Sequence, residues 1–227
     1  MTINISSTIQ QLAFISMALY TIYFSFKNKN SLDHYFYFGI LALLGIIEGL
    51  DSQIIRPLFN RKIPFNIEIF NIYLLFEFSI LSFFFYNETS SNIFKSIIKS
   101  TSIIIILITS ISFIYDTEFI RKNYQILTLI EALIMISFSI KIFVEVIFDD
   151  NINDILQSPK FITSFGIFFL FSITIPYFLL TNYLRIFNAI LYNKLDYLSN
   201  VAYIFFYTTI IRSFALKKSD TTHLKVS

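Results

Sequence analysis

Runs of about twenty apolar residues recur along this chain, and charged side chains bound each run. A helix of about 20 residues crosses the hydrocarbon core of a bilayer, whereas the surface helices of soluble proteins carry one polar face. The runs therefore predict transmembrane helices. We expect about seven of these spans, over residues 9–26, 35–50, 67–86, 97–115, 124–148, 161–184 and 198–216.

The composition leaves little material for any other fold. Hydrophobic residues make up 56% of the 227 residues and charged residues 14%, and there are only four Gly and four Pro. Turns and irregular loops are built mainly from Gly, Pro and small polar residues. The sequence predicts an all-α polytopic membrane protein that forms a single transmembrane domain over residues 1–227. Residues 185–196, between the last two spans, have room for a short interfacial helix.

The basic residues predict which way the chain is oriented. If the N-terminus lies outside, ten of the 17 Lys and Arg residues flank the inner side and seven flank the outer side. Nothing basic precedes Lys27, whereas four basic residues follow Ile211. Cytoplasmic loops carry the excess of basic residues, so we expect the N-terminus outside and the C-terminus in the cytoplasm. Residues 1–11 lack the pattern of a cleavable signal peptide. The abundance of Ile, Phe, Asn and Lys is typical of an AT-rich genome and favours a bacterial cytoplasmic (inner) membrane.

Three glutamates inside the predicted spans are the first candidates for a site. An ionisable side chain near the bilayer centre costs roughly 2.5 to 3.5 kcal/mol and must face protein or water. Glu77 is near the middle of its span, Glu131 is in the outer half, and Glu48 is near the outer end. On the predicted orientation they would line a polar interior that opens outward and binds a ligand. The alternative is structural, with each glutamate hydrogen-bonded to a neighbouring helix.

Polar side chains at helical spacing extend this predicted site. Tyr73 comes one turn before Glu77, Tyr177 lies in the sixth span, and Tyr203 and Tyr207 lie in the seventh. In the sixth span, Pro176 removes a helical hydrogen bond and is expected to kink the helix as a hinge. Alternatively, Pro176 has no functional role, because membrane helices commonly tolerate Pro.

The same residues argue against several chemistries. There is no Cys, and the two histidines, His34 and His223, are too few for a zinc site with three His ligands. The last span, 198–216, has no Lys to form a retinal Schiff base, and no phosphate-binding loop occurs. A net charge of +2 with scattered basic residues gives no indication of nucleic-acid binding. We expect no enzyme activity, no cofactor and no metal.

The third predicted span carries Asn71, Tyr73 and Glu77 in the spacing Asn-x-Tyr-x-x-x-Glu. This segment resembles one found in small seven-transmembrane bacterial proteins and in the membrane sensor regions of some histidine kinases. The resemblance implies a sensory bundle in the cytoplasmic membrane, with Asn71, Tyr73 and Glu77 as the matching ligand positions. Unlike the kinases, this chain ends shortly after its last span, so any output is expected to pass through a separate protein.

Three functions follow from these features. The leading hypothesis is a non-enzymatic sensor, receptor or partner subunit with an outward-facing polar cavity. A small proton- or cation-coupled transporter would use the same carboxylates but would also need a path to the cytoplasm. A structural anchor of a membrane complex is the third. Candidate partners are the lipid bilayer, a cytoplasmic or membrane signalling protein, and further copies of this chain.

Overall fold

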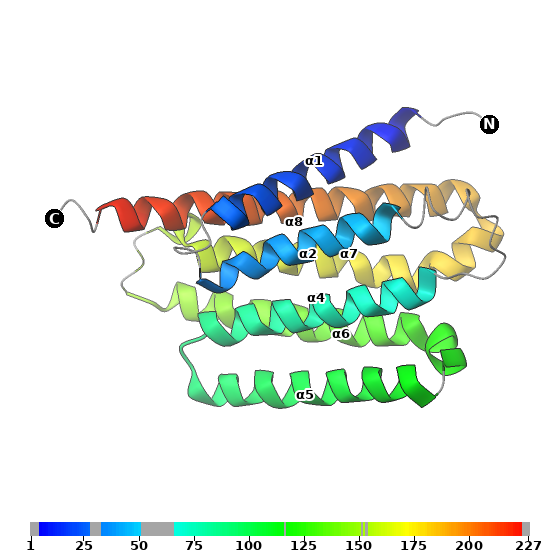
Figure 1. Cartoon of the computed structure of the whole chain (residues 1–227), viewed down its shortest axis with the longest axis horizontal. Helices are drawn as coiled ribbons and strands as arrows, with labels where there is room; N and C mark the ends of the chain where they lie inside the picture. The colour runs from blue at the N-terminus through cyan, green and yellow to red at the C-terminus, as the bar shows by residue number, and fades with distance from the viewer. Residues whose placement is uncertain are drawn as a thin grey trace.

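The computed structural model describes residues 5–27, 33–50, 66–115, 117–150, 152 and 154–223. Helices are the regular structure of this part of the chain, as the composition predicts. Its seven α-helices and two short 3-10 helices (Figure 1) are α1 (Ile5–Lys27), η1 (Asp33–Phe36), α2 (Tyr37–Leu50), α4 (Asn66–Glu88), α5 (Asn92–Tyr115), α6 (Thr117–Ile147), η3 (Ile155–Gln157), α7 (Pro159–Phe187) and α8 (Ala189–His223).

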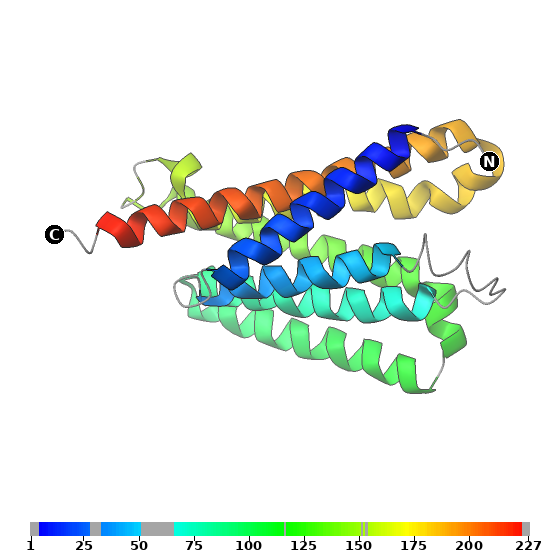
Figure 2. The same cartoon turned by 45° about the horizontal axis from the view of Figure 1, so that its top comes forward.

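Six of the α-helices form a closed bundle, and α5 lies at its edge (Figure 1). Around this six-helix bundle α1 packs on α2, α2 on α4, α4 on α6, α6 on α7, and α7 on α8, which returns to α1. α5 packs on α4 and α6. α1 begins and α8 ends at opposite ends of the bundle (Figure 2). We call the end where α1, α4, α6 and α8 terminate the inner end, because its basic residues predict that it faces the cytoplasm.

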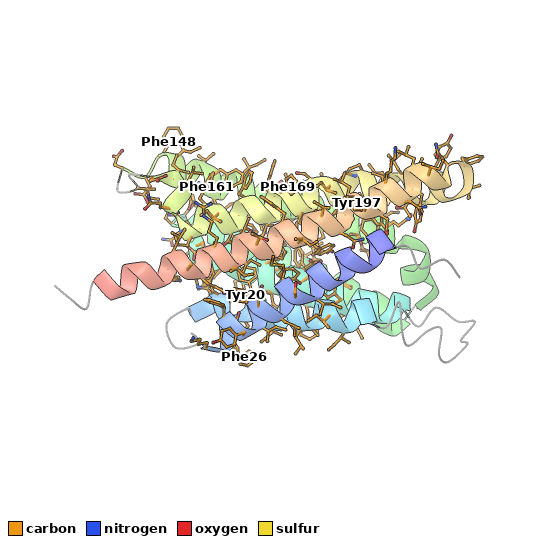
Figure 3. The ribbon with its side chains drawn as sticks, turned by 90° about the horizontal axis from the view of Figure 1, so that it is seen from above. Tyr20, Phe26, Phe148, Phe161, Phe169 and Tyr197 are labelled. Carbon is orange, nitrogen blue, oxygen red and sulfur yellow. The ribbon has the colours of Figure 1, made fainter. Side chains whose placement is uncertain are left out.

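The outside of the bundle is apolar. Ile103, Ile104 and Leu107 on α5 are about half exposed, and aromatic side chains such as Tyr20 and Phe148 also lie on the surface (Figure 3). Water disfavours a continuous surface of this kind, whereas lipid solvates it. Three stretches of described helix are long and apolar enough to cross a membrane, namely Asn92–Ile111, Gln125–Ile147 and Pro159–Thr181. The structure thus supports a membrane protein, and the number of seven spans stays a prediction.

All the described α-helices except α2 are longer than the spans that the sequence predicts, and α6 and α8 show the largest differences. α6 begins at Thr117 instead of residue 124, and α8 covers Ala189–His223 instead of residues 198–216. Hydropathy locates residues that prefer lipid, but Lys and Arg have good helix propensity, so a helix continues into water through them. Residues 185–196 form no separate helix, because α7 ends at Phe187 and α8 begins at Ala189.

Polar side chains at the connections start the next helices. The Ser91 hydroxyl accepts a hydrogen bond from the Phe94 amide at the start of α5. The Asn188 side chain accepts one from the Leu191 amide at the start of α8. Both satisfy amides that have no partner within the first helical turn. Pro159 begins α7, where its missing N–H costs nothing. These local features allow the short connections that hold consecutive helices side by side.

Candidate functional site

Two glutamates lie close together inside the six-helix bundle. Glu77 of α4 is 4% exposed and Glu131 of α6 is 1% exposed. α4 packs on α6, and the two carboxylates interact electrostatically across this contact. Neither carboxylate oxygen of Glu131 has a hydrogen-bond partner among the described residues. The structure therefore brings together two of the three glutamates that the sequence singles out.

Tyrosines from two helices flank this carboxylate pair. Tyr73, one turn before Glu77 on α4, donates a hydrogen bond to Glu77 Oε1 at 3.0 Å. Tyr203 and Tyr207 of α8 interact electrostatically with Tyr73, and Tyr207 also interacts with Glu77. Tyr207, which the sequence places with Tyr203 among the polar side chains of the last span, is fully buried. The sequence signal for it was its position one turn after Tyr203 on the same polar stripe.

The other predicted site residues do not join this group in the described part of the chain. Tyr177 of α7 donates a hydrogen bond to Asp196 of α8 at 3.3 Å, near the connection between these helices. Burial raises the pKa of Asp196, and this hydrogen bond only partly opposes the rise. Pro176 lies inside α7, which is continuous from Pro159 to Phe187, and its hinge role stays a prediction.

Two further predictions fall outside the described residues. The side chains of Glu48 and Asn71 are not described, although α2 and α4 include their backbones. Their expected roles as ligands therefore stay predictions. The same holds for the outward-facing cavity, to which Glu48 was assigned together with Glu77 and Glu131.

Aromatic rings pack beside the carboxylate pair and toward the inner end of the bundle. Phe38 of α2 contacts Phe84 of α4 with ring centroids 5.5 Å apart, and it contacts Phe206 of α8 at 6.2 Å. All three rings are buried. Phe84 follows Glu77 by two helical turns, which places it about 10 Å closer to the inner end. We refer to Phe38, Phe84 and Phe206 as the aromatic layer. Phe206 directly precedes Tyr207 on α8 and is level with the carboxylate pair, so the layer runs from the pair toward the inner end.

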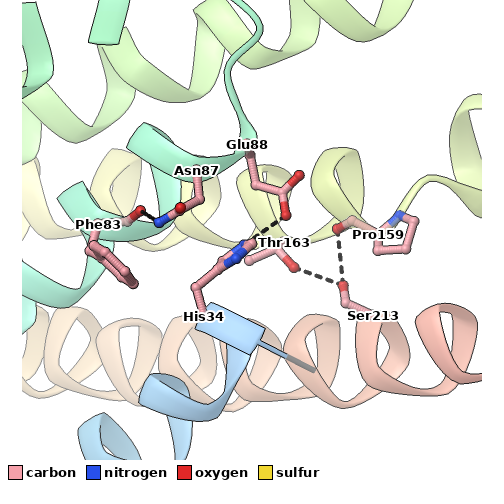
Figure 4. Close-up of polar contacts among 7 residues, drawn as sticks. All are labelled: His34, Phe83, Asn87, Glu88, Pro159, Thr163 and Ser213. Carbon is pink, nitrogen blue, oxygen red and sulfur yellow. Dashed lines mark hydrogen bonds and ion pairs between the residues drawn. The ribbon is translucent and has the colours of Figure 1, made fainter. Parts of the chain in front are cut away.

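A second polar cluster lies at the inner end, and Figure 4 shows His34 and Glu88 close to Thr163 and Ser213. His34 Nε2 and Glu88 Oε1 are 2.8 Å apart, which ties η1, just before α2, to the end of α4. Close by, Thr163 of α7 donates a hydrogen bond to Ser213 of α8 at 2.8 Å. Ser213 Oγ also lies 3.2 Å from the carbonyl oxygen of Pro159. This cluster links helices that are distant in the sequence.

Interactions with His34 and Lys217 lower the pKa of Glu88 in the inner cluster. Burial by itself would raise the pKa of Glu88, but the hydrogen bond and charge of His34 outweigh it, together with the charge of Lys217. The pKa of Glu88 therefore stays below its ordinary value. Lys217 Nζ also lies 4.4 Å from the ring centroid of Tyr35. The sequence did not indicate this cluster, because His34 and Glu88 are 54 residues apart and both lie at span borders.

A third set of polar contacts closes the inner end of α6. Glu145 lies 3.2 Å from Lys141 Nζ. It also accepts hydrogen bonds from Thr89 Oγ1 at 2.6 Å and from the Ser90 amide at 3.0 Å. These contacts fix the connection between α4 and α5 to α6. Both oxygens of this carboxylate have a donor, whereas those of Glu131 on the same helix have none among the described residues.

The part of the protein that the structure describes has no cluster of side chains typical of a metal centre. The described residues contain no group of three or more His, Cys, Asp or Glu side chains that could hold a metal ion. Comparison with known protein families, curated proteins and solved structures gives no match. The residues of the chain itself are therefore the guide to its function.

Proposed function

We propose that this chain is a non-enzymatic, receptor-like protein of a bacterial inner membrane that binds a proton or a small cation between Glu77 and Glu131. The observation that carries the proposal is the buried carboxylate of Glu131, which has no hydrogen-bond partner in the described residues and lies beside a second carboxylate. Two buried carboxylates repel each other, and each loses hydration. A proton or cation held between them relieves both costs.

The tyrosines beside the carboxylate pair are also compatible with a proton or a small cation as the ligand. The Tyr73 hydroxyl already donates to Glu77, and hydroxyl oxygens are ligands that hard cations accept. Glu77, Glu131 and Tyr207 are all buried, so a ligand that fits without rearrangement of the helices is small. With the N-terminus outside and seven crossings, it would enter from the outer end. The bound state would then be passed to a separate signalling partner.

The aromatic layer favours a receptor over a carrier. A carrier must open its site to the cytoplasm as well as to the outside. Phe84, with Phe38 packed against it, lies about 10 Å closer to the inner end than Glu77. The transporter is the second candidate because it would use the same glutamates, and it requires this layer to part.

Thermal unfolding of the purified full-length chain in detergent tests the site. Sodium or potassium chloride is compared with choline chloride at equal ionic strength over a pH series. We expect Glu131→Gln to abolish the stabilisation by the cation or by protons that the parent shows. Because the substitution removes a repulsive, unpartnered charge, the variant should fold and be at least as stable as the parent in choline chloride.

Glu145→Gln is the matched control, since it makes the same change on the same helix. Glu145 is held by Thr89 and Lys141, so this variant should lose stability but keep the cation response. Cation or proton flux into proteoliposomes that depends on Glu131 would assign the carrier instead. Equal responses in the parent and Glu131→Gln would reject the site and leave the pair with a structural role.

A further inference from the structure

The inner cluster contains His34, which the proposed function does not use. His34 and Glu88 are 2.8 Å apart, and their side chains are only 12% and 16% exposed. His34 is in η1, at the start of α2, whereas Glu88 is the last residue of α4. The contact therefore fastens the α1–α2 hairpin to the rest of the bundle at its inner end (Figure 4).

Packed rings connect this contact to the carboxylate pair. The His34 ring lies 6.0 Å from Phe84, whose ring lies 5.5 Å from Phe38. Phe38 lies 6.2 Å from Phe206, and Phe206 lies 5.4 Å from Tyr207. Tyr207 interacts electrostatically with Glu77. Close-packed side chains of this kind move together rather than independently, so a shift at either end has a physical route to the other.

We propose that the His34–Glu88 contact is a proton-sensitive latch between the α1–α2 hairpin and α4, and that the aromatic layer couples the latch to cation binding at Glu77 and Glu131. The coupling rests on the proposed function. The latch itself rests only on the geometry of the inner cluster. Coupling of this kind is reciprocal, so each site changes the affinity of the other by the same factor.

The charges around His34 determine how the latch responds to pH. Among the described residues, the groups that face it or its partner are Glu88 from α4, Lys217 from α8, and Tyr35 from η1 itself. Thr163 and Ser213 contribute uncharged hydroxyls from α7 and α8. Histidine changes charge between about pH 5 and 8. When His34 loses its proton, the ion pair with Glu88 becomes a hydrogen bond from a neutral imidazole. Lys217 is then the cationic side chain that interacts with Glu88.

Distance measurements on the full-length chain test the latch. The sequence has no Cys, so spin labels can be placed at Tyr37→Cys on α2 and Asn87→Cys on α4, two exposed positions beside the contact. In phosphatidylcholine vesicles, we expect one narrow distance distribution at about pH 6 and a broader, longer one at about pH 8. His34→Gln should abolish this pH dependence. His223→Gln, which removes the other histidine, should keep it.

Cation titration in sodium chloride tests the coupling. His34→Gln should change the half-saturating sodium or proton concentration of the central pair by at least about fivefold, while His223→Gln leaves it unchanged. If His34→Gln does not fold, Glu88→Gln breaks the same contact from α4. Distances that do not vary with pH in the parent would overturn the latch. An unchanged half-saturation in His34→Gln would overturn the coupling.

Failure of the proposed function is a separate result. It would appear in the parent, as a cation and proton response that Glu131→Gln does not alter. The coupling would then fall with it. The spin-label distances would still decide whether His34 and Glu88 form a latch.

Discussion

Glu88 is a carboxylate that interacts with His34 and Lys217, and its electrostatics give a pH prediction. The pKa of Glu88 in the folded chain lies below its ordinary value, because His34 and Lys217 outweigh the effect of burial. A carboxylate with a lowered folded pKa stabilises the fold above its unfolded pKa. That stabilisation is lost as the pH falls through the folded pKa.

We expect Glu88→Gln to lower the free energy of unfolding by about 1 to 3 kcal/mol near neutral pH, as for hydrogen bonds to charged groups. The difference from the parent should shrink at acid pH, where the parent loses the same charge. Denaturant unfolding in detergent across a pH series measures both effects. Asp150→Asn, which alters an exposed carboxylate on the same side, should leave the profile unchanged. The prediction would be wrong if the free energies of unfolding of the parent and of Glu88→Gln differed by the same amount at all pH values.

Sequence alone reveals some of these residues and hides others, for a physical reason. Glu77 and Glu131 stand out because lipid penalises a charge in the middle of an apolar run. His34 and Glu88 lie at span borders, where water solvates charges and no penalty marks them. Only the packing of α2 on α4 brings His34 to Glu88. Phe38, Phe84 and Phe206 were equally hidden, since Phe occurs 29 times in the chain.

At the scale of elements, the antiparallel pair of α7 and α8 depends on one close approach. A Cβ added to Gly166 would collide with the Thr209 Oγ1 and would lie 3.0 Å from the Thr209 Cβ. Small residues let membrane helices approach closely, and packing rather than burial drives their association. Gly166 therefore sets the distance between the two helices in the half of the bundle that holds Ser213 and Thr163.

We expect Gly166→Ala to destabilise the chain by about 1 to 3 kcal/mol, the usual cost of overpacking. Adding Thr209→Ala should recover part of the loss, because it removes the hydroxyl that the new methyl group meets. Ser100→Ala, on an exposed position of α5, is the control. Unfolding in detergent compares the four proteins. A Gly166→Ala variant as stable as the parent would show that the helices separate at little cost.

Helix positions could be predicted more reliably than helix lengths. Each predicted span coincides with a helix, because a lipid-exposed backbone must satisfy its own hydrogen bonds. The ends of α6 and α8 could not be predicted, since hydropathy marks where lipid ends and not where the helix ends. α8 has 35 residues, or about 52 Å at 1.5 Å per residue, against a hydrocarbon core of about 30 Å. It therefore extends well beyond one membrane thickness.

At the scale of the whole molecule, the two ends of the helical bundle differ in role. Glu77 lies about 10 Å outward of Phe84 on α4, whereas His34, Glu88 and Lys217 gather at the inner end. The receptor that we propose needs its two ends on opposite sides of the membrane. The start of α1 and the end of α8 lie at opposite ends of the bundle (Figure 2), as an odd number of crossings requires.

Single cysteines test this topology in intact cells. We expect a membrane-impermeant maleimide to label Ser6→Cys and Asn188→Cys directly, because the predicted orientation places both outside. Ser90→Cys and Ser219→Cys should react only after permeabilisation, because the excess of basic residues predicts a cytoplasmic inner end. The parent chain, which has no Cys, is the control for labelling that does not depend on cysteine. Labelling of Ser6→Cys and Ser219→Cys from the same side would rule out seven crossings, and it would leave the carboxylate pair without a separate inner end to signal to.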